Sequence, residues 1–416
     1  MSKNIPGKEV INIKLGLGYL DLSNVDEFYF IEDLTIPFMT GFLKFYDRSG
    51  AMERAPLTGH EIITITYGDS NDEDNTIVFV IYSMKRVDPT NQFGGSKDTS
   101  IELVLVEPMF FSLTLRKYST SWPQGTLLSD IVKDLCRKVL GVNDVDEFFD
   151  WEDSIEKIGD TEGCIPSFYM PYWTTLETIK WIMKRCSGSI SKTPGYVFYN
   201  SPKGLSFVTL ENLFQNEKLD PKEQYSFVSE FAADDFKILS WSLHPIDHQS
   251  YIGLMGGHKM GYNHDYRFLM DADNKYETSI NKYTLMGKKS LFPLINDTSI
   301  RFDMEGDSDI TILDNISGHE FIRRYINQMM LIITVRGNEK RYAGGMIDIM
   351  WPSSNKEDPY NINLAGYWMV KSITHHFNNN APYYHQKMTL IKTAYSDSTS
   401  EILAPSGKSR QLRGVK

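Results

Sequence analysis

The chain has 416 residues, a length too great for one hydrophobic core, which predicts two to four domains. Hydrophobic residues make up 41% of the sequence and charged residues 23%, values that are ordinary for folded proteins and exclude a mainly disordered chain. The formal net charge is −11 without a basic stripe. Because tight binding of nucleic acid needs clustered Lys and Arg, the sequence argues against tight binding of that kind.

The sequence carries no sign of membrane insertion or secretion. Its longest apolar stretches, such as 77–82 and 329–335, are far shorter than the ~20 residues of a membrane-spanning helix. The N-terminus lacks the apolar core of a signal peptide, so we expect folding in a cytoplasm. The three cysteines include no Cys-x-x-Cys pair and signal neither a disulfide framework nor a zinc finger. We interpret Cys136 and Cys186, which lie in helical patterns, as small core residues and assign no role to Cys164.

Residues 1–112 have the pattern of strands almost throughout. Strand patterns occur at 10–15, 27–31 and 42–46, followed by a three-strand pattern at 61–106. Polar turns at 47–50 and 56–59 separate the earlier strands. Several antiparallel strands with polar loops and no long helix predict a small β-barrel or sandwich.

Residues 113–212 change to helical periodicity and predict an α+β domain. A first amphipathic helix is indicated before Gly141 by apolar residues spaced three and four apart, namely Leu128, Ile131, Val132, Leu135 and Val139. A capping box of Thr174 and Glu177 opens a second helix, which we expect to end at Gly188.

A β-hairpin completes this domain. Apolar and aromatic residues alternate over 196–210 around a turn at 202–204, where Pro, Lys and Gly follow one another. The α+β domain is therefore predicted to combine two helices with a hairpin.

Strand patterns return at 225–228 and 236–244, and we group 213–245 with 317–395 as a second barrel. The section 246–316 between them is polar and rich in Gly and Tyr, so we expect an inserted subdomain there.

A capping box of Ser317 and Glu320 predicts a helix where the second barrel resumes. Residues 396–416 lack apolar periodicity and are expected to be a flexible tail unless a partner orders them.

A three-strand pattern occurs twice, at 61–106 and again at 346–391, with an offset of about 285 residues. Both copies alternate apolar residues in the first strand, carry a polar loop, and continue with an apolar second strand. Met388 and Leu390 fall where Leu103 and Leu105 did. Chance similarity of two β-meanders stays an alternative. We interpret the repeat as two equivalent barrels. Together with the α+β domain between them, they predict a mixed β and α+β fold.

Acidic clusters are the first candidates for chemistry. Glu147, Asp150, Glu152 and Asp153 crowd together, but adjacency in sequence does not create the two carboxylate environments of a glycoside hydrolase. A solvated acidic loop is the simpler interpretation. A second cluster places Gly306 at the fourth position rather than the sixth that an EF-hand requires, which favours a surface loop over a calcium site for Asp303, Glu305, Asp307 and Asp309.

Histidines and nucleophiles give no stronger signal. His375 and His376 point to opposite faces of a strand, so a shared metal ion with His385 would need a bulge. His258 and His264, beside Gly256 and Gly257, lack ligand spacing. The sequence has no Gly-x-Ser-x-Gly elbow and no phosphate loop. We therefore expect no catalytic, cofactor-binding or metal-binding residues.

Four segments resemble the central hub protein of contractile phage tail baseplates, a family related to the hub portion of type VI secretion spike proteins. The first resembles that family's opening of strand, Asp, turn, Gly-x-Glu and strand, with Asp47, Gly59 and Glu61 at the named positions. The matching segments are 42–62, 171–186, 195–210 and 366–390. Their order along the chain carries the resemblance, and the section 246–316 matches no part of it.

The resemblance implies a structural adaptor rather than an enzyme. Such a hub is a homotrimer whose two barrels per subunit imitate six-fold symmetry, joining a hexameric tail tube to a trimeric spike. Its partners would be the tube protein, the spike protein and other baseplate components, and the spike is expected to be a separate chain. The assembly would belong to a virion tail that forms in the host cytoplasm. DNA would pass through the lumen without tight binding, and no cofactor or membrane insertion is implied.

Two other functions stay open from the residues alone. A cell-wall glycan-cleaving baseplate enzyme would use the acidic cluster at 147–153. A β-sandwich receptor-binding or glycan-binding tail component would expose Trp351 and Trp368 as sugar platforms, whereas we expect both within or beside the barrel core.

Overall fold

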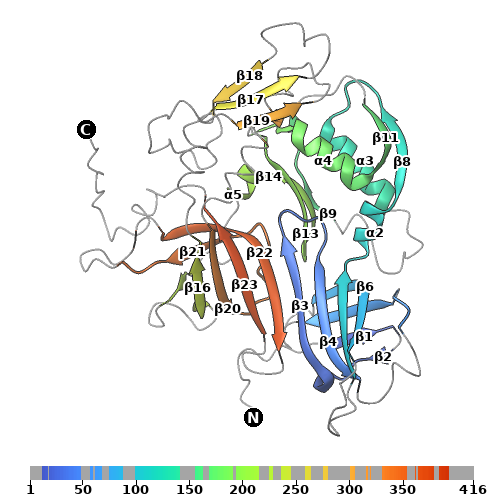
Figure 1. The fold of residues 1–416 in the computed structure, drawn as a ribbon. Helices are drawn as coiled ribbons and strands as arrows, with labels where there is room; N and C mark the ends of the chain where they lie inside the picture. Colours follow the sequence, from blue (N-terminus) through green and yellow to red (C-terminus); the bar gives the residue numbers. More distant parts are fainter. Residues whose placement is uncertain are drawn as a thin grey trace.

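The computed structural model describes most of the two β-rich parts and of the segment between them (Figure 1). The described residues are 12–16, 18–47, 57–59, 61–67, 75–87, 99–140, 155–162, 168–190, 194–214, 224–227, 236–244, 258–263, 275–279, 300–304, 315–316, 319, 330–353, 361, 364–378 and 384–392. Over these residues the architecture is mostly antiparallel β with few helices, which confirms the β-rich fold class.

One large sheet of 13 strands dominates the molecule. The N-terminal part of the chain contributes β1 (Asn12–Leu15), β2 (Gly18–Tyr19), β3 (Val25–Asp33), β4 (Thr40–Asp47), β5 (Ile62–Tyr67), β6 (Asn75–Val87) and β7 (Thr99–Val106). The C-terminal part contributes β15 (Tyr225–Ser226), β16 (Ser240–Leu243), β20 (Met330–Arg336), β21 (Met346–Met350), β22 (Gly366–Asn378) and β23 (Tyr384–Ile391). A 3₁₀ helix, η1 (Leu22–Asn24), precedes β3.

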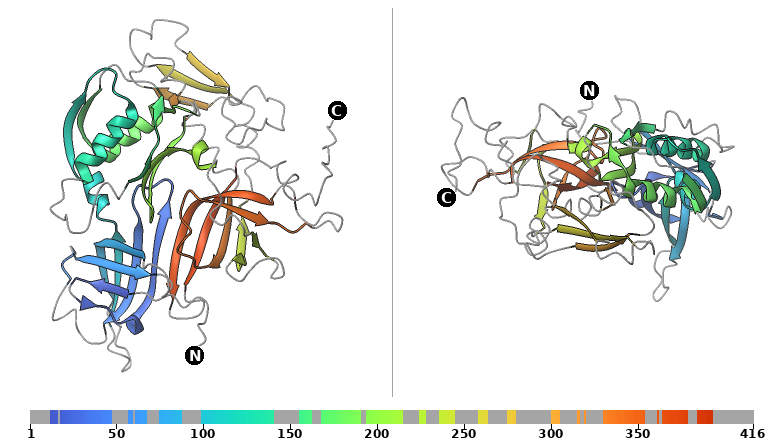
Figure 2. Two further views of the ribbon diagram at one scale, coloured as in Figure 1. Left: turned by 180° about the vertical axis from the view of Figure 1, so that it is seen from behind. Right: turned by 90° about the horizontal axis from the view of Figure 1, so that it is seen from above.

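The strand order in this sheet brings the two ends of the chain together. It runs β16-β20-β23-β22-β3-β4-β7-β6-β5-β1-β2, with β21 paired to β22 and β15 to β21. Strands drawn in orange and red therefore lie beside strands drawn in blue in Figure 1 and in the left view of Figure 2. The joint is the antiparallel pair of β22 with β3, which we call the seam.

Each half of the sheet buries one face, as the alternating sequence predicts. In β4 the residues Gly41, Leu43 and Phe45 are buried while their neighbours are partly exposed, and β20 alternates in the same way. The buried side chains form two separate clusters, one around β3 to β7 and one around β16 and β20 to β23. Two hydrophobic cores thus lie under one continuous sheet.

The two halves repeat the same five-strand arrangement. We call β3, β4, β7, β6 and β5 the first unit and β16, β20, β23, β22 and β21 the second unit, because the neighbours follow the same order in both. The register agrees as well: Leu103 pairs with Leu43 and Met84 in the first unit, and Met388 pairs with Ile333 and Ile373 in the second. The offset of 285 between Leu103 and Met388 is the one the sequence repeat predicts.

A β-bulge stands at the same place in both units. The register shifts between Ile81 and Ser83 in the first unit and between Val370 and Ser372 in the second. The strands facing these bulges pair Leu105 with Ile81 and Leu390 with Val370, so the bulges are equivalent. Because side chains alternate with period two, the extra residue moves the core-facing positions from odd to even numbers in β6 and from even to odd in β22.

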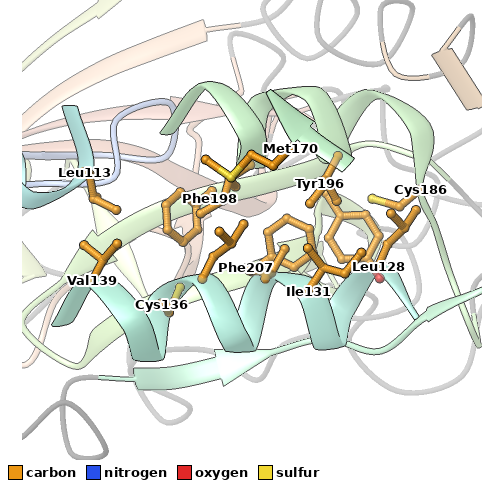
Figure 3. Close-up of a cluster of buried hydrophobic side chains, with 14 of the residues drawn as sticks. Leu113, Leu128, Ile131, Cys136, Val139, Met170, Cys186, Tyr196, Phe198 and Phe207 are labelled. Carbon is orange, nitrogen blue, oxygen red and sulfur yellow. The ribbon is translucent and has the colours of Figure 1, made fainter. Parts of the chain in front are cut away.

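The segment between the units, which we call the middle domain, has a hydrophobic cluster of its own (Figure 3). It contains α2 (Met109–Thr114), β8 (Lys117–Trp122), α3 (Leu128–Leu140), β9 (Ile155–Ile158), β10 (Thr161–Glu162), β11 (Phe168–Thr174), α4 (Thr175–Arg185), β12 (Ser187–Gly188), β13 (Tyr196–Ser201), β14 (Gly204–Thr209) and α5 (Leu210–Phe214). One face of α3 packs on aromatic residues of the β13–β14 hairpin, and Cys136 and Cys186 are buried there, as predicted. Burial raises the pKa of both thiols, that of Cys136 to about 12.

Helix α4 begins where the sequence predicts and ends earlier. The Thr174 hydroxyl accepts from the Glu177 N–H at 3.2 Å, and the Glu177 carboxylate accepts from the Thr174 N–H at 2.8 Å, which completes the capping box. The expected end at Gly188 is wrong, because the helix ends at Arg185. Ser187 and Gly188 instead pair with β10, and this pairing requires the extended backbone that starts at Cys186.

A separate three-stranded sheet lies within the predicted insertion. Its order is β18-β17-β19, from β17 (His258–Asn263), β18 (Lys275–Ser279) and β19 (Ile300–Met304). The helix predicted after Ser317 lies mostly outside the described residues, and the tail at 396–416 lies wholly outside them.

Candidate functional site

The seam between the two units contains a buried network of polar side chains. It pairs Ser372 with Asp33 at one end and Asn378 with Glu27 at the other. At its centre the buried Glu32 and His375 face each other, with 2.7 Å between Glu32 Oε1 and His375 Nε2. Glu32 Oε2 accepts from the Ala343 N–H at 2.9 Å, so both carboxylate oxygens have partners.

Hydrogen bonds continue from this pair into the second unit. The hydroxyl of Tyr384 lies 2.8 Å from His375 Nδ1 and accepts from Gln386 Nε2 at 3.1 Å. Gln386 Oε1 in turn accepts from Arg341 Nη1 at 2.9 Å, and Arg341 Nε donates to the Tyr225 hydroxyl at 2.7 Å. A neutral His375 that donates from Nε2 and accepts at Nδ1 satisfies every one of these bonds. The seam is thus joined by one continuous buried network.

Aromatic rings surround the Glu32–His375 pair and exclude water. The ring of His375 stacks on Phe30 with 4.1 Å between centroids and 10° between planes. Phe377 stacks on Phe28 from the other unit at 5.3 Å and on Tyr384 at 4.4 Å. A polar pair in such an apolar site depends strongly on each partner, since an unpaired buried group costs more than the pair contributes.

The middle domain is joined to the first unit through a second buried carboxylate, Glu107, which follows β7. Its oxygens accept from Asn200 Nδ2 at 2.7 and 2.8 Å and from the Met39 N–H at 3.0 Å. Burial raises the pKa of Glu107 to about 7 and the nearby Glu32 adds to this rise, against the lowering effect of the hydrogen bonds. Asn200 Oδ1 has no hydrogen-bond partner among the described residues.

Apolar contacts join the middle domain to both units. Side chains from the first unit, the hairpin and α5, and the second unit share one cluster of Leu34, Tyr199, Val208, Leu210, Leu213, Ala343, Met346, Met369 and Ile391. Gly344 has a φ of +90°, and a Cβ placed there would lie 2.6 Å from the Tyr199 hydroxyl. Only glycine fits this contact between the second unit and the hairpin.

The Gly-x-Glu motif of residues 59 to 61 has a structural role. The Glu61 carboxylate accepts from the Thr58 N–H at 2.6 Å, the Thr58 hydroxyl at 2.8 Å and the Gly59 N–H at 2.9 Å. Burial acts to raise the pKa of Glu61, but these hydrogen bonds outweigh it and lower the pKa to about 2. The motif therefore fixes the turn that leads into β5.

Several of the candidate residues from the sequence lie among the described residues. His375 and His376 lie on opposite faces, as predicted, and His376 stacks on His385 at 5.0 Å. Burial and neighbouring positive groups lower the pKa of His376 to about 4. Trp351 and Trp368 are buried, so neither is an exposed sugar platform. Among the described residues no group of three or more metal-ligating side chains gathers, and no helix there could span a membrane.

Most of the remaining candidate residues lie outside the part of the chain that the structure describes. Glu147, Asp150, Glu152 and Asp153 are outside the described residues, as are Glu305, Asp307, Asp309, Gly256, Gly257, His264 and Cys164. Asp303 and His258 belong to β19 and β17.

The sequence did not single out Glu32 or Glu107. A usable signal existed for Glu32, because it continues the core-facing series of Phe28 and Phe30 on β3, where an acid needs a partner.

The chain resembles two solved tail proteins. The 43 kDa tail protein of prophage MuSo2 from Shewanella oneidensis has a TM-score of 0.60 at 9% identity, covering 93% of this chain and 99% of that one. A tail protein from Neisseria meningitidis MC58 has a TM-score of 0.58 at 10% identity, with the same shares covered. This chain shares the fold of these two tail proteins. No protein-family model matches the sequence, and no curated protein sequence matches it either.

The seam predicts a strong dependence on His375. We expect His375→Phe to lower the free energy of unfolding by about 3 kcal/mol, because Glu32 Oε1 and the Tyr384 hydroxyl lose a buried partner while the ring volume is kept. Urea unfolding followed by circular dichroism measures the loss. His376→Phe on the adjacent, half-buried position is the control and should cost less than about 1 kcal/mol. Equal losses in the two variants would contradict a special role of the seam.

The raised pKa of Glu107 predicts a pH-dependent stability. The folded state holds the proton more tightly than the unfolded state, so this contribution is complete below pH 4.5 and is lost as the pH rises towards 7. Glu107→Gln is permanently neutral, and we expect it to stabilise the protein by up to about 3 kcal/mol at pH 8 and far less at pH 5. Thermal unfolding at both pH values tests this, and an equal effect at pH 5 and pH 8 would refute it.

Proposed function

We propose that this protein is a structural hub of a contractile tail baseplate, with no catalytic turnover. The observation that carries the proposal is the repeated unit: two five-strand arrangements with one register and one bulge position lie side by side in a single sheet. The fold similarity to phage tail proteins supports a place in a virion tail. Each unit is proposed to belong to a small barrel of the tail-tube kind.

The symmetry follows from the repeat. Three copies of a chain with two equivalent units present six similar units around an axis, whereas every other part occurs three times. A hexameric tube requires the pseudo-six-fold symmetry of the six units, and a trimeric spike requires the three-fold symmetry of the other parts. A homotrimer would therefore join tube and spike as an adaptor. Such a ring uses heterologous contacts, in which different surfaces of one chain meet.

The proposed domains are the two repeated barrels and the segments that lie between and after them. We propose a first barrel at 1–112, an α+β domain at 113–212, a second barrel at 213–245 and 317–395, an insertion at 246–316 and a tail at 396–416. The buried Glu107 contacts and the shared apolar cluster fix the α+β domain to both units, which supports a rigid subunit. Tube, spike and other baseplate proteins are its proposed partners, assembled in the host cytoplasm.

The burial of Trp351 and Trp368 argues against a glycan-binding function at these two residues, because a sugar platform needs exposed rings. The cell-wall enzyme alternative rests on residues 147–153 and gains no support from the described residues.

The trimer is tested by measuring mass. We expect the purified chain to have three times its monomer mass of 47.8 kDa in light scattering and native mass spectrometry at micromolar concentration, because obligate interfaces are large and apolar. A stable monomer under these conditions would contradict the proposed hub.

The lumen of the ring is tested by DNA binding. With a net charge of −11 and no basic stripe, the ring is proposed to let DNA pass without gripping it. We expect the assembly to flow through a DNA-cellulose column at physiological salt. Strong retention there would mean that the lumen is a DNA-binding surface.

A further inference from the structure

The seam uses a different strand from each unit, and the equivalent strands of the two units have no such partner among the described strands. Within the chain, β22 of the second unit pairs with β3 of the first unit. The counterpart of β22 is β6, and the counterpart of β3 is β16. Among the described strands none pairs with β6 beyond Val80 on the β5 side, and β16 pairs with β20 alone. The chain thus carries the two halves of a second seam, one on β16 of the second unit and one on the part of β6 beyond Val80 in the first unit.

Exposure on β6 indicates a missing neighbour. Met84 and Ile373 occupy equivalent core-facing positions, since both pair with the equivalent residues Leu103 and Met388. Ile373 lies in the seam and is 0% exposed, whereas Met84 is 47% exposed. The difference arises because β3 covers Ile373 and no described strand covers Met84.

Exposure on β16 shows the same difference. Trp241 is the counterpart of Phe28, because Trp241 pairs with Ile333 as Phe28 pairs with Leu43. Phe28 is 0% exposed and stacks on Phe377 across the seam, whereas Trp241 is 53% exposed. The indole packs edge to face with Trp351 inside its own unit, with 5.0 Å between centroids, so it is held in place at the open edge.

We propose that β16 of one copy of this chain pairs antiparallel with β6 of the next copy and repeats the seam register between subunits. Transfer of that register places Lys85 opposite His244 and Arg86 opposite Leu243, as Thr374 faces Ile31 and His375 faces Phe30 within the chain. This inference rests on the proposed ring and assigns its subunit contact to particular strands.

A second copy is the occupant that fits both edges at once. Each edge has its complement on the same chain, and a head-to-tail contact of this kind continues from copy to copy until the ring closes. The pairing would satisfy the open backbone groups of both strands and cover Met84 and Trp241 with apolar side chains. It would also turn three sheets into one closed sheet without a free edge at either strand.

The register is tested with paired cysteines. Lys85→Cys with His244→Cys, in a Cys164→Ser background, places two exposed positions directly opposite each other, where cross-strand Cβ atoms lie about 5 Å apart and a disulfide forms readily. The control combines Lys85→Cys with Ser240→Cys, four residues along the partner strand and therefore about 13 Å away. Mild oxidation and non-reducing electrophoresis should show covalent dimers and trimers for the matched pair, at least roughly tenfold more than for the control.

A surface variant gives a second readout that needs no disulfide. Met84→Lys should weaken self-association by at least roughly tenfold, because a charge would be buried at the new seam. Ile190→Lys, at a position 91% exposed in the middle domain, is the control and should leave association unchanged. Light scattering over a dilution series measures both.

The outcomes separate the two proposals. A trimeric mass with no preference for the matched cysteine pair, or with Met84→Lys as harmless as Ile190→Lys, would overturn this contact and leave the hub proposal standing. A monomeric mass without intermolecular disulfides would overturn both.

Discussion

Strand register is the constraint on which the rest of this structure depends. Side chains of a strand alternate with period two, so a slip of one residue would move every core residue to the other face. The bulge at residue 82, repeated at 371, changes the core-facing parity halfway along a strand of 13 residues. The first half of each long strand can therefore complete the core of its own unit, and the second half is free to meet a neighbouring unit.

The polar network at the seam acts together with this register. Glu32 and His375 are buried in an aromatic site and satisfy each other only when β3 and β22 pair as they do. Any other register would leave a carboxylate or an imidazole without a partner in an apolar core, which costs several kcal/mol. The network thus favours one relative position of the two units, and every symmetry relation of the proposed assembly starts from that position.

The middle domain, which occurs once in the chain, is fixed to the two repeated units. Glu107 and Asn200 connect the first unit to the hairpin of the middle domain, and the close approach of Gly344 to Tyr199 connects the hairpin to the second unit. A subunit joined in this way transmits the position of its sheet to the middle domain. In a ring of three copies, the sheet would provide pseudo-six-fold symmetry and the middle domain would keep strict three-fold symmetry.

The sequence by itself determined the local structure and the repeat. Alternation gave the strands, the Thr174–Glu177 capping box gave the start of α4, and equal spacing gave the equivalence of Leu103 with Met388, because these features depend on residues close together in the chain. Only the tertiary structure decided the end of α4, which depends on pairing with β10, and the partners of Glu32 and Glu107, which lie 343 and 93 residues away in His375 and Asn200. Burial and long-range pairing set these features, and no local pattern encodes which distant strand will be the neighbour.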